Sequence, residues 1–335
     1  MRKEELNWGI IGCGDVVERK FMPSIIKTKH SKVTAVFGRD RDKVEAFTKK
    51  YDIQKSYTSI DDFLKDKEID IVYIATPTYV HAEQTIMSAN AGKHVLCEKP
   101  MALNVKEGKE MITAAKANQV QLMIAFYRRF YPVVTKIKEI ISMELIGKLI
   151  TARVFSGSLY SPTSKQKHNW RGDASLSGGG WIWDVGSHRL DLLVFLLGKP
   201  EEVSAYLSSV YIDLQVEDSC VLILEFENKI QLSSTFNWNI YGSFDEFAIY
   251  GTEGYVKTCD LETGDLIVCT KESHSSYHLP RVLPTHLPVI ENFTKSINEG
   301  RKNICTGEMG LETSKILEAA TLSSNKKRSV RLCTL

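Results

Sequence analysis

The chain has 335 residues, more than one ordinary domain needs, which favours two domains, each with its own hydrophobic core. Hydrophobic residues make up 43% and charged residues 25%, and the net charge is +2, so neither nucleic acid nor a membrane surface is an expected partner. The 7 cysteines are scattered without a C-x-x-C pair, which argues against a disulfide framework and favours a reducing cytoplasm. No signal peptide or membrane-spanning run is expected either.

The first third of the chain alternates strand and helix signals. Short apolar runs typical of buried parallel strands are each followed by a helical pattern. The predicted strands are residues 7–12, 32–38, 69–77, 93–99 and 121–127, and the predicted helices are a segment ending near residue 28 that Pro23 kinks, then 42–52, 59–66, 79–92 and 104–119. This alternation predicts an α/β domain with a doubly wound parallel sheet, which we place at residues 1–126.

Past Pro132 the alternation gives way to a series of β-forming segments. One predicted helix, residues 133–143, precedes strands at 148–157, 201–214, 219–227, 229–241, 244–251, 254–260 and 265–271. Gly, Asn and Asp turns separate the later strands, which indicates an antiparallel sheet. Two helical segments, 288–300 and 308–325, close a second domain that we place at 127–335, and the final helical segment is a candidate to pack back on the first domain.

Two glycines follow the first predicted strand in the stretch GIIGCGDVV. Gly12 permits a tight turn, and Gly14 lets a pyrophosphate approach the backbone at a helix N-terminus with its positive partial charge. The third position of the G-x-G-x-x-G/A fingerprint is Val17, so helix and strand must lie slightly further apart there. A plain glycine turn is the alternative, but the place at the start of a βαβ run favours a dinucleotide site.

The end of the second predicted strand indicates which dinucleotide binds. An NAD site usually has Asp or Glu there for the ribose 2′-hydroxyl, whereas this chain has Gly38 followed by Arg39. A carboxylate would repel a 2′-phosphate, and a guanidinium can hold it through two hydrogen bonds. A solvated charged turn is the alternative, because Asp40 and Asp42 are interleaved with the basic residues. We expect NADP(H) in preference to NAD(H).

Two further groups of polar residues lie where chemistry is expected. Lys99 follows the apolar run HVLC, and in an open α/β sheet ligands collect beyond the carboxyl ends of the strands. Further along, Asp184, His188 and Asp191 stand at i, i+4 and i+7, so a helix would place them on one face. They border a strongly apolar segment, where titratable groups need partners or a function. A capped helix with a structural histidine is the alternative for this trio.

The chain contains, in this order, GIIGCG, ATPTYVH, HVLCEKPMAL, AFYRRFYP, NWRGD and GGGWIWDVGSHRLDLL. Together these stretches resemble the glucose–fructose oxidoreductase/inositol dehydrogenase (Gfo/Idh/MocA) family, with E-K-P and D-x-G-x-H as the specific signatures. The resemblance implies an N-terminal Rossmann domain and a C-terminal α/β domain with a large, mostly antiparallel open sheet. It also implies a homodimer or homotetramer formed through that sheet, and often a cis Lys99–Pro100 bond.

The resemblance assigns roles to matching positions. Lys99 would polarise the reacting oxygen, His188 would act as general acid/base, and Asp184 would orient substrate or imidazole. The implied substrate contacts are Lys99, Arg128, Trp170, Arg171, Asp184 and His188. The implied cofactor contacts are Gly12, Gly14, Asp15, Val16, Gly38, Arg39, Thr76, Pro77, His81, Glu98 and Lys99.

The implied activity is hydride transfer between nicotinamide C4 of NADP(H) and a secondary alcohol or carbonyl of a sugar, polyol or inositol-like compound. Two alternatives stay open: a dihydrodiol or nucleotide-sugar dehydrogenase/reductase of the same family, and a non-catalytic NADP-sensing regulator. The presence of Lys99, Asp184 and His188 together disfavours the regulator, which needs no proton-transfer group.

Smaller signals complete the expectations. No metal is expected, because His274 and His278 lack an accompanying carboxylate cluster. The glycine run at 178–180 is expected to let the backbone approach the nicotinamide closely. Candidates to face a sugar, with an ordinary role in the sheet as the alternative, are Tyr160, Asn237 and Trp238.

Overall fold

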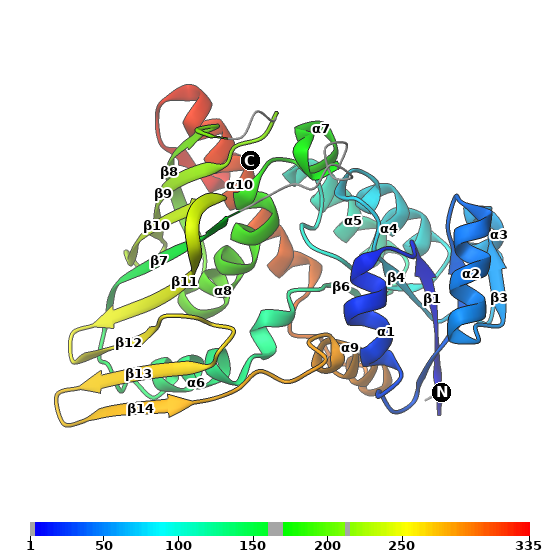
Figure 1. Cartoon of the computed structure of the whole chain (residues 1–335), viewed down its shortest axis with the longest axis horizontal. Coiled ribbons are helices and arrows are strands. Elements are labelled where there is room, and N and C mark those ends of the chain that lie inside the picture. Colours follow the sequence, from blue (N-terminus) through cyan, green and yellow to red (C-terminus); the bar gives the residue numbers. More distant parts are fainter. Residues whose placement is uncertain (1–3, 160–169, 212–214) are drawn as a thin grey trace. The chain divides into compact units, whose positions relative to one another are not determined.

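The computed structural model describes residues 4–159, 170–211 and 215–335 (Figure 1). The chain forms two compact units, each of which is built from two separate stretches of sequence. The first unit consists of Met1–Tyr127 and Val282–Leu311, and the second of Arg128–Arg281 and Glu312–Leu335.

A six-stranded parallel sheet forms the centre of the first unit, with strand order β3-β2-β1-β4-β5-β6. The strands are β1 (Leu6–Ile11), β2 (Ser31–Phe37), β3 (Lys55–Tyr57), β4 (Ile71–Ile74), β5 (His94–Cys97) and β6 (Leu122–Ile124). The helices are α1 (Met22–Ile25), preceded by the π-helical turn η1 (Val17–Phe21), then α2 (Arg41–Tyr51), α3 (Ile60–Lys65), α4 (His81–Asn90), α5 (Val105–Ala117) and α9 (Leu287–Glu299). The predicted doubly wound parallel sheet is confirmed.

The order of the strands places a crevice at the centre of this sheet. The order reverses between β1 and β4, which are hydrogen-bonded neighbours. In an open α/β sheet, ligands bind beyond the carboxyl ends of the strands at such a reversal. The carboxyl ends of β1, β2, β4 and β5 are therefore where the cofactor residues should lie.

The segment that returns to the first unit late in the sequence packs against this sheet. Phe293 of α9 contacts Trp8 of β1 edge to face, with ring centroids 6.1 Å apart. The buried hydroxyls of Ser31 and Thr294 are 3.0 Å apart. Residues 282–311 are thus part of the first unit, although they follow the long β region in the sequence.

A nine-stranded mixed sheet forms the centre of the second unit, in the order β14-β13-β12-β11-β7-β10-β9-β8-β15. β7 and β10 pair in parallel and the other neighbours pair antiparallel, which confirms the predicted mostly antiparallel sheet. The strands are β7 (Leu149–Leu159), β8 (Pro200–Ser208), β9 (Ser219–Phe226), β10 (Gln231–Asn237), β11 (Asn239–Gly251), β12 (Gly254–Thr258), β13 (Asp265–Thr270), β14 (His274–His278) and β15 (Val330–Arg331). Helices of this unit are α6 (Pro132–Ser142), α7 (Ala174–Ser177) and α8 (Ser187–Leu197), while α10 (Gly307–Lys326) begins in the first unit and ends in the second.

Side-chain caps explain where several helices begin. Asp40, Ser59 and Asn104 each accept a hydrogen bond from the backbone N–H three residues further on, at 3.1, 3.3 and 2.9 Å. The longest helix is α10, with 20 residues. Within the described ranges, no helix is both long enough and apolar enough to cross a membrane.

Candidate active site

The expected cofactor contacts of the first unit follow the carboxyl ends of four strands. β1 leads into Gly12, Gly14, Asp15 and Val16, β2 into Gly38 and Arg39, β4 into Thr76, Pro77 and His81, and β5 into Glu98 and Lys99. Because parallel strands end on the same side, the fold gathers these residues along one edge of the sheet. We call this set of residues the cofactor edge.

Gly12 and Gly14 meet different demands on this edge. Gly12 has a φ of +92°, and a Cβ there would lie 3.1 Å from the carbonyl oxygen of Ala75, so the fold itself requires glycine. A Cβ on Gly14 would meet no atom within 4 Å. The space at Gly14, in front of the first helical turn, is therefore available to a ligand, and it fits the pyrophosphate of a dinucleotide.

Gly38 and Arg39 also divide their roles between fold and ligand. A Cβ on Gly38 would lie 2.6 Å from Cγ2 of Val44, so glycine allows α2 to pack close to the end of β2. Asp40 is occupied as the N-cap of α2, where it accepts the N–H of Lys43. Arg39, by contrast, is exposed at the cofactor edge. Its guanidinium can therefore meet a ligand.

His81 is a buried member of the cofactor edge and is 1% exposed. Its Nδ1 is 2.9 Å from the carbonyl oxygen of Pro100, and its Nε2 is 2.9 Å from that of Thr76. Burial lowers the pKa of His81, although both carbonyl contacts act in the opposite direction. The imidazole therefore ties the loop after β4 to the loop after β5.

Glu98 supports Lys99 from inside the unit. The Lys99–Pro100 bond is cis, as the family resemblance implies. The Glu98 carboxylate accepts the hydroxyl of Tyr73 at 2.7 Å and lies 2.9 Å from Nε2 of His286. Burial by itself would raise the pKa of Glu98, but His286, Tyr73 and Lys20 outweigh burial and hold it at about 2. The carboxylate is therefore ionised at neutral pH.

The second unit carries Asp184 and His188 at the start of a buried helix. Asp184 lies in the π-helical turn Ile182–Gly186, and His188 lies in the first turn of α8, where it is 5% exposed. Nε of Arg171 is 3.3 Å from Oδ2 of Asp184, and the same guanidinium lies over the ring of Trp170 at 4.7 Å. The structure therefore brings Trp170, Arg171 and Asp184 together within this unit.

Asp191, the third member of the expected helical face, binds a different partner. Arg129 donates to it from Nε at 2.8 Å and from Nη2 at 2.6 Å, and both side chains are 1% exposed. The π-helical turn widens the backbone just before α8, so Asp184 does not keep α-helical register with the residues that follow. The expected single face is thus divided: Asp184 pairs with Arg171, and Asp191 pairs with Arg129.

The glycine run at 178–180 is explained by protein contacts. The indole of Trp183 occupies the place of a Cβ on Gly178 or Gly179, and the carbonyl oxygen of Glu217 occupies that place on Gly180. The Glu217 carboxylate also accepts the N–H of Gly180 at 2.8 Å. These contacts require glycine without a ligand, and the expected close approach of the run to the nicotinamide stays a prediction. Glu217 lies 37 positions further on, which is why spacing alone did not indicate it.

Arg128 belongs to a buried ion-pair network of the second unit. Its Nη1 is 2.8 Å from Asp245 and its Nη2 is 2.7 Å from Glu262. The carboxylate of Asp245 also makes two contacts with the guanidinium of Arg189, which is the neighbour of His188 in the sequence. Arg128 is therefore tied through Asp245 to the start of α8, and sequence reasoning missed both carboxylates.

The last candidates are the residues expected to face a sugar and the histidines considered for a metal site. Trp238 is 2% exposed and packs against Trp181 with ring centroids 5.5 Å apart, while Asn237 ends β10. Tyr160 lies outside the described residues. Among the residues that the structure describes, no group of three or more His, Cys, Asp or Glu side chains is placed to bind a metal.

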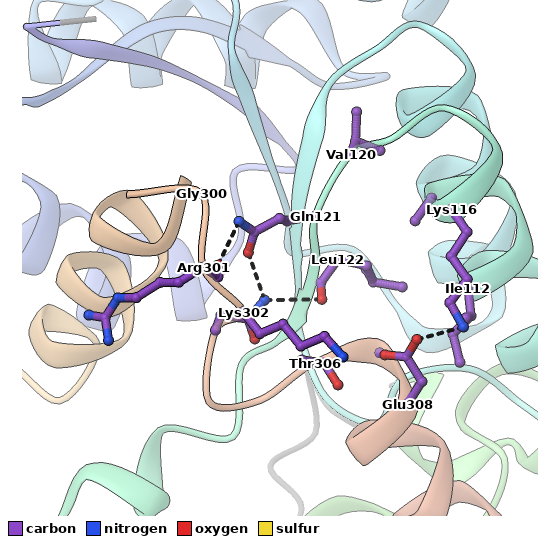
Figure 2. A pocket seen from close by; sticks show the side chains of 13 residues that line it. Ile112, Lys116, Val120, Gln121, Leu122, Gly300, Arg301, Lys302, Thr306 and Glu308 are labelled. Atoms are coloured by element: carbon purple, nitrogen blue, oxygen red, sulfur yellow. Dashed lines mark hydrogen bonds and ion pairs between the residues drawn. The ribbon is translucent and has the colours of Figure 1, made fainter. Parts of the chain in front are cut away.

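A pocket of about 380 Å³ lies in the first unit, near the start of β6 (Figure 2). Gln121, which precedes β6, bonds to the backbone of Arg301 and to the amide of Asn303 within it. Lys116 pairs with Glu308 across its rim at 2.8 Å. The pocket lies at the amino end of β6, whereas the cofactor edge lies beyond the carboxyl ends of the strands. It is therefore separate from the candidate active site.

Comparisons with known proteins agree with this geometry. Residues 6–126 match the model of an oxidoreductase family with an NAD-binding Rossmann fold, and residues 134–257 match the Gfo/Idh/MocA C-terminal domain. An oxidoreductase of Formosa agariphila is 31% identical over 94% of this chain and 98% of its own length. The trans-1,2-dihydrobenzene-1,2-diol dehydrogenase of Danio rerio is 33% identical over 75% of this chain and 74% of its own length.

A solved structure agrees as well. The complex of levoglucosan dehydrogenase with NADH and levoglucosan superposes with a TM-score of 0.90 at 25% identity, over 98% of this chain and 99% of that one. Both family models match in the order in which the two sheets occur. The chain therefore belongs to the Gfo/Idh/MocA family of oxidoreductases, with a nicotinamide-dinucleotide-binding Rossmann domain and the C-terminal domain of that family.

Proposed function

We propose that the protein is an NADP(H)-dependent dehydrogenase or reductase that interconverts a secondary alcohol and a carbonyl on a sugar, polyol or inositol-like compound. The observation that carries this proposal is the arrangement of Lys99, which follows β5 on the cofactor edge and whose neighbouring carboxylate is fixed by buried donors. A charged lysine held on that edge is suited to polarise a substrate oxygen. Asp184 and His188 of the second unit complete the set of reacting groups.

In the direction of oxidation, His188 takes the proton of the substrate hydroxyl as the O–H bond breaks and the carbonyl forms. A nicotinamide bound at the cofactor edge would supply the acceptor for the hydride that leaves the carbinol carbon. The ammonium of Lys99 stabilises the negative charge that develops on the oxygen. Asp184 orients the substrate or the imidazole, and Arg171 holds Asp184. In the direction of reduction, His188 returns its proton to the carbonyl oxygen.

The preference for NADP(H) is proposed from Gly38 and Arg39. No carboxylate follows β2 directly, and the exposed Arg39 guanidinium can grip a 2′-phosphate. Arg39→Ala should weaken NADPH binding about tenfold or more and leave NADH binding unchanged. Arg41→Ala is the matched control, because Arg41 is exposed nearby and pairs with Glu45 at 3.8 Å. Equal losses for both cofactors in Arg39→Ala would contradict the assignment.

The substrate class is proposed from the relatives. One is named for a cyclic dihydrodiol, and the solved structure contains the anhydro sugar levoglucosan. Both compounds present a ring hydroxyl, which supports a hydroxylated ring as substrate here, with a dihydrodiol or a nucleotide-linked sugar as the second candidate. The test measures the change in absorbance of the reduced cofactor when the protein is mixed with each of a panel of aldoses, inositols, anhydro sugars and dihydrodiols. Tight NADPH binding without turnover of any of them would instead favour a cofactor-sensing regulator.

We also propose that a second copy of the chain covers the outer face of the nine-stranded sheet. Tyr206, Val221 and Ile223 are exposed on β8 and β9, and their alternate neighbours are buried. Tyr206 and Val221 are register partners, so the apolar side chains are adjacent. Ile223→Lys should convert the oligomer to monomers, as measured by sedimentation. A monomeric wild-type protein would contradict the proposal.

A further inference from the structure

The carboxylate beside Lys99 is held by a histidine from a distant part of the sequence. His286 lies 188 positions beyond Glu98, directly before α9, and its side chain is 0% exposed. Its Nε2 is 2.9 Å from Oε1 of Glu98. The returning segment of the first unit therefore reaches the inner side of the cofactor edge through this imidazole.

Three donors from different elements converge on the Glu98 carboxylate. Oε1 accepts the Tyr73 hydroxyl at 2.7 Å and faces Nε2 of His286, and Oε2 lies 3.3 Å from the backbone N–H of Lys99. Each carboxylate oxygen thus has a partner, and one partner is the peptide that carries the proposed catalytic side chain. Movement of the carboxylate would move that peptide.

The charges around His286 fix the direction of its hydrogen bond. Glu98 is an ionised acceptor, so Nε2 must carry the hydrogen. On its other side, the ring of Tyr127 lies 5.2 Å from the imidazole, and Lys20 contacts the Tyr127 hydroxyl at 3.2 Å. Nδ1 faces the hydroxyl of Thr285 at 3.4 Å. The Lys20 cation and the N-terminus of α9 are the positive groups on that side, and Glu98 is the negative one.

We propose that His286 is a positioning residue for Lys99, acting through Glu98. The donor at Nε2 holds the carboxylate where its other oxygen accepts the Lys99 N–H, and thereby aims the ammonium at the substrate. This inference rests on the proposed function, in which Lys99 polarises the reacting oxygen. His286 itself touches neither substrate nor cofactor in this role.

A purely structural role for His286 makes a different prediction. A buried histidine that only stabilised the fold would change the melting temperature when replaced, and each folded molecule would still turn over normally. Replacing a positioning residue lowers kcat per folded molecule. The KM for the cofactor stays unchanged, because His286 does not take part in the glycine turn after β1 (Gly12 and Gly14) where the pyrophosphate is expected. Misplacement of a catalytic group by about 1 Å can lower the rate by tenfold or more.

The test compares His286→Gln with His286→Asn. Both substitutions bury an uncharged amide, but the glutamine amide reaches the position of Nε2, whereas the asparagine amide is one bond shorter. Thr294→Val is the matched control, because Thr294 is also a buried residue that anchors the α9 segment and bonds to Ser31, away from Glu98. kcat is measured per cofactor-binding site by titration, together with the melting temperature and the cofactor KM.

We expect His286→Asn to lower kcat about tenfold, His286→Gln to keep kcat within about threefold of wild type, and Thr294→Val to change the melting temperature alone. Equal kcat for the glutamine and asparagine variants would overturn the inference, and so would an equal loss in Thr294→Val. Lys99→Ala, measured in parallel, separates this inference from the proposed function. If Lys99→Ala is inactive and both His286 variants are normal, the positioning role alone is wrong.

Discussion

The Lys99 loop and the Asp184–His188 segment are built in opposite ways. Glu98, which supports Lys99, is 8% exposed and binds donors from β4 and from the segment before α9. Asp184 is 30% exposed, and its 3.3 Å pair with Arg171 lies partly in solvent. A buried charged network holds its members far more firmly than a surface ion pair, which contributes at most about 1 kcal/mol.

This difference teaches which parts of the site are fixed by folding. The position of Lys99 follows from the packing of the first unit and should be insensitive to salt. The Asp184 carboxylate takes part in an ion pair that solvent screens. Substitutions on the two sides should therefore fail in different ways.

The strongest test of the comparison removes the proposed reacting groups themselves. Lys99→Ala and His188→Ala should each lower kcat by at least about two orders of magnitude, the usual contribution of a positioned proton-transfer or polarising group. Cofactor affinity should change less than about twofold, because Gly12 and Gly14 after β1 are intact. kcat is measured by cofactor absorbance and affinity by fluorescence titration. Near-normal turnover in either variant would remove that residue from the mechanism.

Acid stability tests how firmly the Lys99 side is held. The pKa of Glu98 is about 2 in the folded protein and near 4.5 when the chain is unfolded, so its ionised form stabilises the fold above pH 4.5. That contribution, up to about 3 kcal/mol, is lost as pH falls from 4.5 toward 2. Wild type and Glu98→Gln should therefore differ most in unfolding free energy at neutral pH and converge near pH 2. A difference that is constant over this range would contradict the account.

Substitutions of the two glycines after β1, also in the first unit, distinguish a role in the fold from a role in cofactor binding. Gly14→Ala should leave the melting temperature unchanged, because a Cβ there meets no atom, yet weaken cofactor binding about tenfold by filling the space for the pyrophosphate. Gly12→Ala should lower the melting temperature, because its φ of +92° is strained for alanine. Thermal unfolding and cofactor titration check both. A destabilised Gly14→Ala protein with normal cofactor affinity would reverse these roles.

The smallest effect is expected for Arg171, whose ion pair with Asp184 is partly exposed to solvent. Arg171→Ala should lower kcat/KM only two- to threefold, since a surface ion pair contributes about 0.5 kcal/mol. The difference from wild type should shrink further at high ionic strength. Steady-state kinetics at low and high salt measure this. A loss above about thirtyfold that salt does not alter would show that Arg171 acts directly on the substrate.

Much of the fold could be predicted from local pattern. The glycine turn at Gly12, the apolar runs before Gly38 and Lys99, and the alternation of strands and helices all point to one parallel sheet. Residues 282–311 follow the antiparallel region in sequence, and nothing local in them shows that α9 packs against Trp8 of the first strand.

The proposed reacting groups of the candidate site could be named from the sequence, whereas the residues that support them could not. Lys99, Asp184 and His188 stand in recognisable motifs, whereas His286 and Glu217 act through contacts between distant positions. The π-helical turn at Ile182–Gly186 also escaped prediction, because helical spacing assumes 3.6 residues per turn throughout. Supports of this kind depend on tertiary packing, which no short stretch of sequence specifies.

The most direct test of the central claim is the turnover of the double variant Lys99→Ala/His188→Ala beside the two single variants. If both groups act on one substrate oxygen, removing the second adds little to the loss caused by the first, and the double variant should fall close to the worse single variant. Losses that multiply would mean that the two residues act independently, and this would contradict the account.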